Sequence, residues 1–494
     1  MKRRIVATLL LIVMLMGMMA ACSGQNDPTT APTQGNTPTT APTAAPTEPN
    51  KTVGNFEVPA VGYDGSKVEI VFYNTMGANL AAVLDAYIVE FNKLYPNITV
   101  VSQNVGNYDD CRDKISTDIT VGKQPNIAYC YPDHVALYNL AGAVTTLDEL
   151  IASEIQVTRA DGTTEQLGLT DAQIADFIEG YYNEGKQFGD GLMYTMPLSK
   201  STEVLYYNKT FFTENNIPVP TTWDELEAVC AQIKALDPKS IPLGYDSEAN
   251  WFINMTEQYK TPYTSATGNH FLFNNAENRA FIKEFNEWYQ KGYLTTQTLY
   301  GNYTSGLFVS TTDVKSYMSI GSSAGATHQR PAKNAEGEYP FEVGIASIPQ
   351  VDAANPKVIS QGPSVCIFQK GNPQEVVASW LFVKFLTTNV EFQAEFGMAS
   401  GYVPVIKSVS SNPVYADFMA NADGGNNIAA LSAKVCMEQA HAYYTSPAFN
   451  GSSEARDQVG ALLTKCLALK GDNVDDKIEE AFEDAIDECE YAVS

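Results

Sequence analysis

The chain has 494 residues, a hydrophobic fraction of 44 % and a formal net charge of −26 at pH 7. A surface this acidic excludes binding to a nucleic-acid backbone, which needs clustered Lys and Arg. It also repels anionic lipid head groups, so attachment to a membrane must come from a covalent anchor. We expect a globular protein with room for two or three domains and no nucleic-acid partner.

The N-terminus has the pattern of a lipoprotein export signal. Residues 1–21 begin with a basic run, continue as an apolar stretch and end in Ala20-Ala21, which is typical of a secretory signal. Cys22 follows directly, as in the lipobox of bacterial lipoproteins, and this predicts lipidation of Cys22. A plain membrane helix is the alternative, although the run is short for a span of about 20 residues. We expect lipid anchoring at Cys22 on the outer face of the cell membrane.

The composition changes after Cys22. Residues 22–63 are rich in Thr, Pro, Ala and Asn and contain little that could join a core. Such segments form flexible or polyproline-like spacers, so we expect a disordered tether. A mucin-like or wall-spanning stalk is the alternative. Both interpretations place the folded part outside the cell.

Cysteine and histidine usage favours a protein without metal or cofactor. Seven cysteines remain besides Cys22, no C-x-x-C is present and several lie in apolar runs. We interpret most as small buried hydrophobic residues, with one disulfide as the alternative. The four histidines are scattered without H-x-x-x-H spacing, which argues against a histidine-based zinc site.

Strands and helices alternate in the first part of the chain. Strands are predicted at 67–74, 97–105 and 125–132, and helices at 78–96 and 108–122. This alternation predicts a parallel α/β sheet with right-handed crossovers, whose ligands bind beyond the carboxyl ends of the strands. The polar and aromatic residues near those ends are 74–76, 107–109 and 131–133.

A second set of elements follows. Residues 204–207 form a β-branched and aromatic run that predicts a buried strand. The polar cluster 199–203 precedes it and would be costly to bury without hydrogen-bond partners. Further strands are expected within 314–328, 339–350 and 358–368, and helices at 221–236, 274–294, 373–397, 429–444 and 458–491.

Segments 197–212, 217–226 and 385–409, together with the lipobox and tether, carry a family resemblance. In this order and spacing the chain resembles a family-1 extracellular solute-binding lipoprotein, the receptor of an ABC importer for carbohydrates or related polyols. It is similar in particular to the glycerol-3-phosphate-binding and sugar-receptor branch. The resemblance covers nearly all the mature chain. It implies an α/β, two-lobed, periplasmic-binding-protein-like clam shell, with a mixed, mostly parallel sheet flanked by helices in each lobe.

The resemblance also implies how the chain is divided between the lobes. Residues 64–199 with 365–401 would form the N-terminal lobe, and 200–360 with 405–494 the C-terminal lobe. Three hinge crossovers would join them, near 197–201, 360–364 and 401–405.

Ligand contacts follow from the family motifs. Tyr108 and Tyr402 match ligand-binding tyrosines, and Trp251 could stack on a sugar face. Gly362 matches a position where the backbone approaches the ligand, which the missing Cβ permits. Each aromatic residue could instead belong to the core, and each serine to a turn. The implied contacts are Tyr108, Asp133, Ser201, Thr202, Trp251, Ser322, Ser323, Gly362, Tyr402 and Phe449.

Two departures from the glycerol-phosphate branch bear on the ligand. Asp133 matches the acidic ligand position only with a shift of about one residue. Phe449 aligns where an arginine would clamp a phosphate, and Arg456 is out of step. We therefore favour a neutral mono- or oligosaccharide over glycerol 3-phosphate or a glycerophosphodiester.

The expected function is that of a monomeric receptor, not an enzyme, which captures a carbohydrate and delivers it to the permease of an ABC importer. A secreted glycan-active hydrolase is the rival from another class. It would need two carboxylates roughly 5–10 Å apart, and no motif places such a pair. No G-x-S-x-G nucleophile motif occurs either. A glycan sensor without an importer would share the fold.

Overall fold

The computed structural model describes residues 53–493, which lie in one compact unit. The predicted signal, Cys22 and most of the predicted tether lie outside the described residues. The end of the predicted tether is ordered: Phe56 is buried, and the Asn55 amide donates to the Val144 carbonyl at 2.8 Å. Burial of the Phe56 side chain stabilises the fold, so the folded part begins before residue 63.

The first sheet has the strand order β2-β1-β3-β13-β6. β1 runs parallel to β2 and β3, whereas β13 runs antiparallel to β3 and β6. Two of its strands thus come from sequence far beyond the first three. The strands are β1 (Val68–Asn74), β2 (Ile98–Asn104), β3 (Ile127–Cys130), β6 (Thr195–Pro197) and β13 (Ser364–Ile367).

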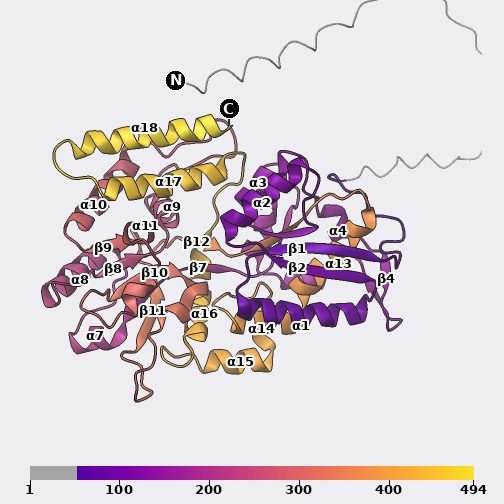
Figure 1. The fold of residues 1–494 in the computed structure, drawn as a ribbon, viewed down its shortest axis with the longest axis horizontal. Coiled ribbons are helices and arrows are strands. Elements are labelled where there is room, and N and C mark those ends of the chain that lie inside the picture. Colours follow the sequence, from indigo (N-terminus) through magenta and orange to yellow (C-terminus); the bar gives the residue numbers. More distant parts are fainter. Residues whose placement is uncertain (1–52, 494) are drawn as a thin grey trace, which may run out of the picture. The chain divides into compact units, whose positions relative to one another are not determined.

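Helices cover both faces of the first sheet (Figure 1). On one face Phe382 packs edge-on against Phe91 and Phe72, with ring centroids 5.0 and 6.4 Å apart. On the other face Cys111 and Cys130 belong to a separate apolar cluster. The helices are α1 (Ala78–Leu94) and α13 (Pro373–Thr388) on the first face, and α2 (Tyr108–Thr120) and α3 (Pro132–Asn139) on the second.

The second sheet is also mixed, with the order β14-β12-β7-β10-β8-β9 and β11 paired to β7. β7 runs antiparallel to β10, β11 and β12, while β8 runs parallel to β9 and β10. The strands are β7 (Ser201–Asn208), β8 (Leu243–Tyr245), β9 (Leu294–Thr296), β10 (Met318–Ser322), β11 (Val343–Ser347), β12 (Val358–Gln361) and β14 (Tyr443–Tyr444).

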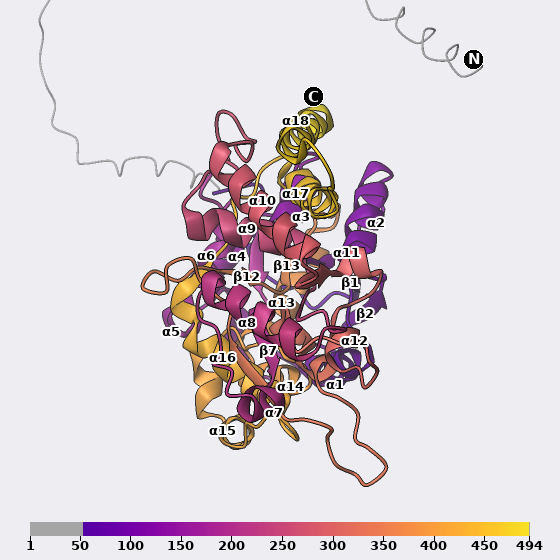
Figure 2. The same cartoon turned by 90° about the vertical axis from the view of Figure 1, so that its left-hand side faces the viewer.

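One face of the second sheet carries a large apolar cluster shared by five helices. Two of these helices come from the end of the chain and lie side by side in both views (Figures 1 and 2). The other face is covered by α16 (Ile428–Glu438). The five helices are α8 (Trp223–Leu236), α9 (Glu248–Tyr259), α10 (Ala276–Gln290), α17 (Ser452–Leu467) and α18 (Val474–Val493).

The chain passes between the sheets where β6 leads into β7 and where β12 leads into β13. A third segment lies beside these two crossovers. Its residue Val403 and the crossover residue Lys200 exchange two backbone hydrogen bonds of 3.1 and 2.7 Å. After this point α15 (Pro413–Ala420) still packs on α14 (Val390–Met398) beside the first sheet. The elements that follow residue 405 therefore begin against the first sheet, not the second.

The architecture confirms the expected α/β fold with two mixed sheets flanked by helices. The sheets are not mostly parallel, because β13 and β7 pair antiparallel with all their neighbours. The seven cysteines of residues 53–493 are all buried and free, so the disulfide alternative is not realised there. Within the same residues no helix is long and apolar enough to cross a bilayer. The remaining short elements are β4 (Gln156–Thr158), β5 (Thr164–Gln166), α4 (Asp148–Ala152), α5 (Asp171–Asp176), α6 (Glu179–Asn183), α7 (Lys209–Glu214), α11 (Gln297–Tyr300) and α12 (Ser305–Phe308).

Candidate ligand-binding site

A cavity of about 1460 Å³ lies where the ends of the two sheets face each other. Thr75 and Tyr131 reach it from the ends of β1 and β3, as expected for ligands of parallel strands. Asp246 and Ser322 reach it from the ends of β8 and β10. Both sheets therefore contribute polar side chains to one cavity.

Stacked tyrosines form the wall contributed by the first sheet. The rings of Tyr108 and Tyr131 stack with centroids 4.5 Å apart, and the Tyr108 hydroxyl lies 3.5 Å from that of Tyr402. Asn107 caps α2 by accepting from two backbone N–H groups, which places Tyr108 at the first helical position. Pro132 at the start of α3 likewise holds Tyr131 just outside that helix.

Asn250 is the hub of a hydrogen-bond network in the wall contributed by the second sheet. Its amide nitrogen donates to Glu203 Oε1 at 3.1 Å and to Gln361 Oε1 at 3.2 Å. Its oxygen accepts from Gln361 Nε2 at 2.9 Å and from the guanidinium of Arg456. The network thereby orients Arg456, which lies on α17, at the cavity wall.

Glu203 is buried in this network and has no ion-pair partner among residues 53–493. Its Oε2 accepts from the Tyr245 hydroxyl at 2.6 Å and from the Asn254 amide at 2.7 Å. Burial raises the pKa of Glu203 to about 7, because desolvation outweighs these hydrogen bonds and the attraction of Arg456. The carboxyl group is therefore held by neutral donors alone.

The cavity lining carries more acidic than basic groups. Oδ1 of Asp246 accepts from the backbone and hydroxyl of Thr304, and Glu248 Oε1 accepts from the Thr298 amide at 2.8 Å. Such a lining repels anions and offers acceptors to hydroxyl donors. The acidic residues are Asp109, Glu203, Asp246, Glu248 and Asp457, and the basic ones are Arg456 and Lys465.

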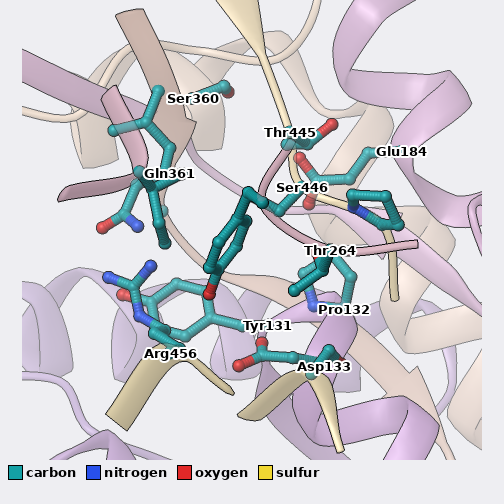
Figure 3. Close-up of a pocket in the computed structure, with 16 residues that line it drawn as sticks. Tyr131, Pro132, Asp133, Glu184, Thr264, Ser360, Gln361, Thr445, Ser446 and Arg456 are labelled. Carbon is teal, nitrogen blue, oxygen red and sulfur yellow. The ribbon is translucent and has the colours of Figure 1, made fainter. Parts of the chain in front are cut away.

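A second, smaller pocket of about 60 Å³ adjoins the cavity. Tyr131, Gln361 and Arg456 line both spaces and so separate them. Figure 3 shows Arg456 and Gln361 on one side of the pocket and Glu184 on the opposite side. The first sheet's helices also contribute Asp133, which accepts a hydrogen bond from the Ser453 hydroxyl of α17 at 3.2 Å.

A buried ion pair lies at the crossovers. Lys200 is fully buried; its Nζ lies 2.5 Å from Glu184 and donates to the Gly362 carbonyl at 3.3 Å and to Ser364 Oγ at 3.1 Å. Gly362 has φ of +97°, and a Cβ there would lie 2.7 Å from the Lys200 Cα. The glycine therefore serves close packing between two crossovers, in addition to lining the smaller pocket.

Six of the ten predicted ligand residues line these two spaces. Tyr108, Ser201, Ser322 and Tyr402 line the cavity. Asp133 and Gly362 line the smaller pocket. These six residues belong to the candidate site.

The other four predicted residues lie in packed structure. Trp251 is fully buried and stacks on Tyr245 at 4.8 Å, so the structure supports its core alternative. Phe449 is 8 % exposed and stacks on His270. The Thr202 hydroxyl donates to the Ile359 carbonyl, and Ser323 Oγ accepts from the Thr202 amide.

Several cavity residues were missed by sequence reasoning. Tyr131 belongs to the expected rim but was passed over for Asp133. Asn250 precedes Trp251 on α9, and adjacent helix positions face different ways, so one lines the cavity and the other the core. Arg456 does not align with the phosphate-binding arginine position of the family motif, where Phe449 stands. Nevertheless Arg456 lines the cavity and Phe449 does not. No local signal distinguished Glu203 or Gln361.

Solved structures with the same fold bind different solutes. UgpB from Mycobacterium tuberculosis, in complex with glycerophosphocholine, superposes with a TM-score of 0.69 at 18 % identity, covering 86 % of this chain and 98 % of that one. The substrate-binding protein Lmo0181 from Listeria monocytogenes, in complex with cycloalternan, gives a TM-score of 0.66 at 18 % identity, with coverages of 86 % and 99 %. These similarities establish the two-lobed binding-protein fold.

Sequence comparison identifies the family. The sn-glycerol-3-phosphate-binding periplasmic protein UgpB of Escherichia coli K12 is 24 % identical over 351 residues, which cover 69 % of this chain and 74 % of UgpB. Residues 86–422 match the family described as bacterial extracellular solute-binding protein, whose members are receptors and not enzymes. Because this match spans well over half of the sequence, the chain belongs to the bacterial extracellular solute-binding protein family.

Proposed function

We propose that the protein is an extracellular receptor that captures a neutral saccharide and delivers it to the permease of an ABC importer. The observation that carries the proposal is the acceptor-rich lining of the cavity opposite stacked tyrosines. Sugar hydroxyls donate to Asp246, Glu248 and the amide network, and a pyranose face packs on Tyr108 or Tyr131. Rotation at the crossovers closes the lobes, and exclusion of water strengthens these hydrogen bonds.

The size of the cavity supports an oligosaccharide. A cavity of about 150 Å³ is enough to bind benzene, which is one six-membered ring. The cavity here, at about 1460 Å³, has room for several rings. A molecule as small as glycerol 3-phosphate would leave most of it filled with water.

Glycerol 3-phosphate or a glycerophosphodiester is the second candidate, because Arg456 lies at the cavity wall. A guanidinium can bind phosphate with two parallel hydrogen bonds. The similar UgpB proteins of Escherichia coli and Mycobacterium tuberculosis bind sn-glycerol 3-phosphate and glycerophosphocholine, respectively. Against this candidate, Arg456 already donates to Asn250, and five carboxylates share the lining.

A thermal-shift screen tests the two candidates. The purified protein is heated with cellotetraose, xylotetraose, maltotetraose, mannotetraose, glycerol 3-phosphate or glycerophosphocholine, since a ligand of the folded state raises the melting temperature. We expect a shift with at least one saccharide and recovery of that saccharide unchanged. A shift with the phosphates alone would reject the saccharide proposal, and cleavage of the sugar would favour the hydrolase.

Lipid anchoring at Cys22 and a monomeric state are further parts of the proposal. The lipobox supports anchoring, since a lipid-bearing cysteine would hold the receptor beside its permease. Replacement of Cys22 by Ser should release the protein into the culture medium, as measured by fractionation and immunoblot. Replacement of Cys230, which is buried, is the matched control and should leave the protein with the cells. Retention of the Cys22 variant on membranes would reject the anchor.

A further inference from the structure

Tyr303 is an aromatic residue of the cavity that makes no ring contact within the described part of the chain. It lines the cavity from the segment between α11 and α12 and is 61 % exposed. Within residues 53–493 its ring stacks on no other ring, whereas the rings of Tyr108 and Tyr131 stack on each other. Burial of an aromatic ring stabilises a fold, yet this ring is left outside the core. Its faces are therefore available to a ligand.

The backbone around Tyr303 is held in place by hydrogen bonds. The Tyr303 N–H donates to Asn302 Oδ1 at 2.8 Å, and its carbonyl accepts from the Gly306 N–H at 3.1 Å. The next residue, Thr304, is fully buried, and its N–H and hydroxyl donate to Asp246 Oδ1 at 2.6 and 2.7 Å. Because both backbone groups of Tyr303 are engaged, the surface that this residue offers to the cavity is mainly that of its side chain. A backbone held in this way loses little conformational entropy when a ligand binds.

Exposure distinguishes Tyr303 from the two stacked tyrosines, and its place in the cavity distinguishes it from its neighbour Tyr300. Tyr108 and Tyr131 are partly buried, so Tyr303 lies closer to the solvent-facing side of the cavity. Tyr300, three residues earlier, is 42 % exposed but lines neither space. Apolar groups are common on protein surfaces, so exposure alone assigns no role. Tyr303 combines exposure with a fixed backbone and a position in the cavity lining.

We propose that Tyr303 forms an outer subsite of the cavity, which stacks on a terminal ring of a bound oligosaccharide and makes the receptor favour longer chains over disaccharides. This inference rests on the proposed function. One sugar ring packs on Tyr108 or Tyr131, and only a chain that extends from there toward solvent also reaches Tyr303. The cavity volume of about 1460 Å³ leaves room for such a chain.

Probes of two lengths test the preference for longer chains. The tetrasaccharide that gives the largest thermal shift is titrated calorimetrically beside its own disaccharide, which is cellobiose, xylobiose, maltose or mannobiose. The wild-type protein should bind the tetrasaccharide at least threefold more tightly than the disaccharide, because one more aromatic ring is engaged. Equal or tighter binding of the disaccharide would overturn the inference while leaving the saccharide receptor intact. A failure of every saccharide to bind would reject the proposed function as well.

Variants of Tyr303 assign the preference to its ring. Tyr303→Ala should weaken tetrasaccharide binding about 3- to 10-fold and leave disaccharide binding and the melting temperature of the free protein unchanged, because the ring is exposed and the backbone hydrogen bonds remain. Tyr303→Phe keeps the ring and should bind the tetrasaccharide as wild type does.

Tyr300→Ala is the matched control, since Tyr300 is exposed on the same segment but lines neither space. It should change neither affinity. Unchanged tetrasaccharide binding by Tyr303→Ala, or an equal loss for both sugars, would overturn the outer subsite. A loss in Tyr303→Phe as large as in Tyr303→Ala would assign the contact to the hydroxyl and overturn the stacking.

Discussion

Two buried glutamates differ in how their charge is compensated. Glu184 at the crossovers is 2 % exposed and forms an ion pair with the fully buried Lys200. Glu203 in the cavity wall is 1 % exposed and is held only by the neutral donors Tyr245, Asn250 and Asn254. The first carboxylate is paired with a cation inside the fold, whereas the second has no such partner among the described residues, and burial raises its pKa to about 7.

The difference separates a structural role from a binding role. The Lys200 ammonium contacts Glu184, the Gly362 carbonyl and Ser364, so this ion pair holds two crossovers together without a ligand. Glu203 orients Asn250 and, through it, Arg456 at the cavity wall. Substitution should therefore affect stability at the crossovers and both stability and affinity at the cavity.

The largest effect is expected for Lys200→Met. Methionine preserves the length of the side chain but leaves the Glu184 charge buried without a partner, which costs about 3–5 kcal/mol of unfolding free energy. Urea denaturation measures the loss. Lys209→Met is the control, because Lys209 and Glu342 form a half-exposed ion pair that contributes at most about 1 kcal/mol. Similar losses in the two variants would show that the buried ion pair contributes no more than an exposed one. The double variant Lys200→Met, Glu184→Gln should recover part of the lost stability, because no buried charge then lacks a partner.

Glu203→Gln should change the pH dependence of stability. The folded pKa of Glu203, about 7, lies above the unfolded value of 4.5, so its contribution is fully present below pH 4.5 and is lost as pH rises through 7. Between pH 5 and 8 this amounts to roughly 2–3 kcal/mol. Gln cannot ionise, so the variant does not lose this stability as the pH rises. The unfolding free energy of the variant minus that of wild type should therefore be about 2–3 kcal/mol larger at pH 8 than at pH 5.

Denaturation in urea at pH 5 and pH 8 measures this difference. The nearby groups that act on Glu203 are Tyr245, Arg456 and Asp246, together with Tyr444. Glu336→Gln is the control for the change in net charge, since Glu336 is exposed and lines neither space. A parallel pH profile for wild type and Glu203→Gln would show that Glu203 is compensated in the same way as Glu184.

Tyr131→Ala tests whether the cavity wall, unlike the crossovers, contributes to ligand affinity. Loss of the ring removes half of the stacked pair and one wall of the smaller pocket, so the dissociation constant for a saccharide should rise about tenfold. Calorimetric titration measures the change. Tyr300→Ala is the control, because Tyr300 is exposed and lines neither space. Equal affinities of the two variants would remove Tyr131 from the site.

The smallest effect is expected for Asp457→Asn. Asp457 on α17 lies 3.3 Å from Arg112 on α2, so the pair joins helices of different sheets. A partly exposed ion pair contributes about 0–1 kcal/mol and is screened by salt. Affinity should fall less than about fivefold, and the difference should vanish at high salt. Asp313→Asn, in an exposed pair with Lys239, should not alter affinity at any salt concentration.

Periodicity and local signals in the sequence determined the elements of the fold. The predicted strand 67–74 and helix 108–122 correspond to β1 and α2, because alternation and capping act within a few residues. The family motifs located Tyr108 and Tyr402, which both line the cavity. The sequence also indicated the family, since its motifs occur in order along most of the chain.

Only the tertiary structure decided which side chains meet in the cavity. Trp251 and Asn250 are neighbours on one helix, and packing against the second sheet sends the first into the core and the second to the ligand side. Arg456 joins Glu203 and Gln361 although more than ninety residues separate it from each of them. A sequence pattern specifies which face of a helix or strand is apolar. Which distant elements lie against each other depends on how those apolar faces pack in three dimensions.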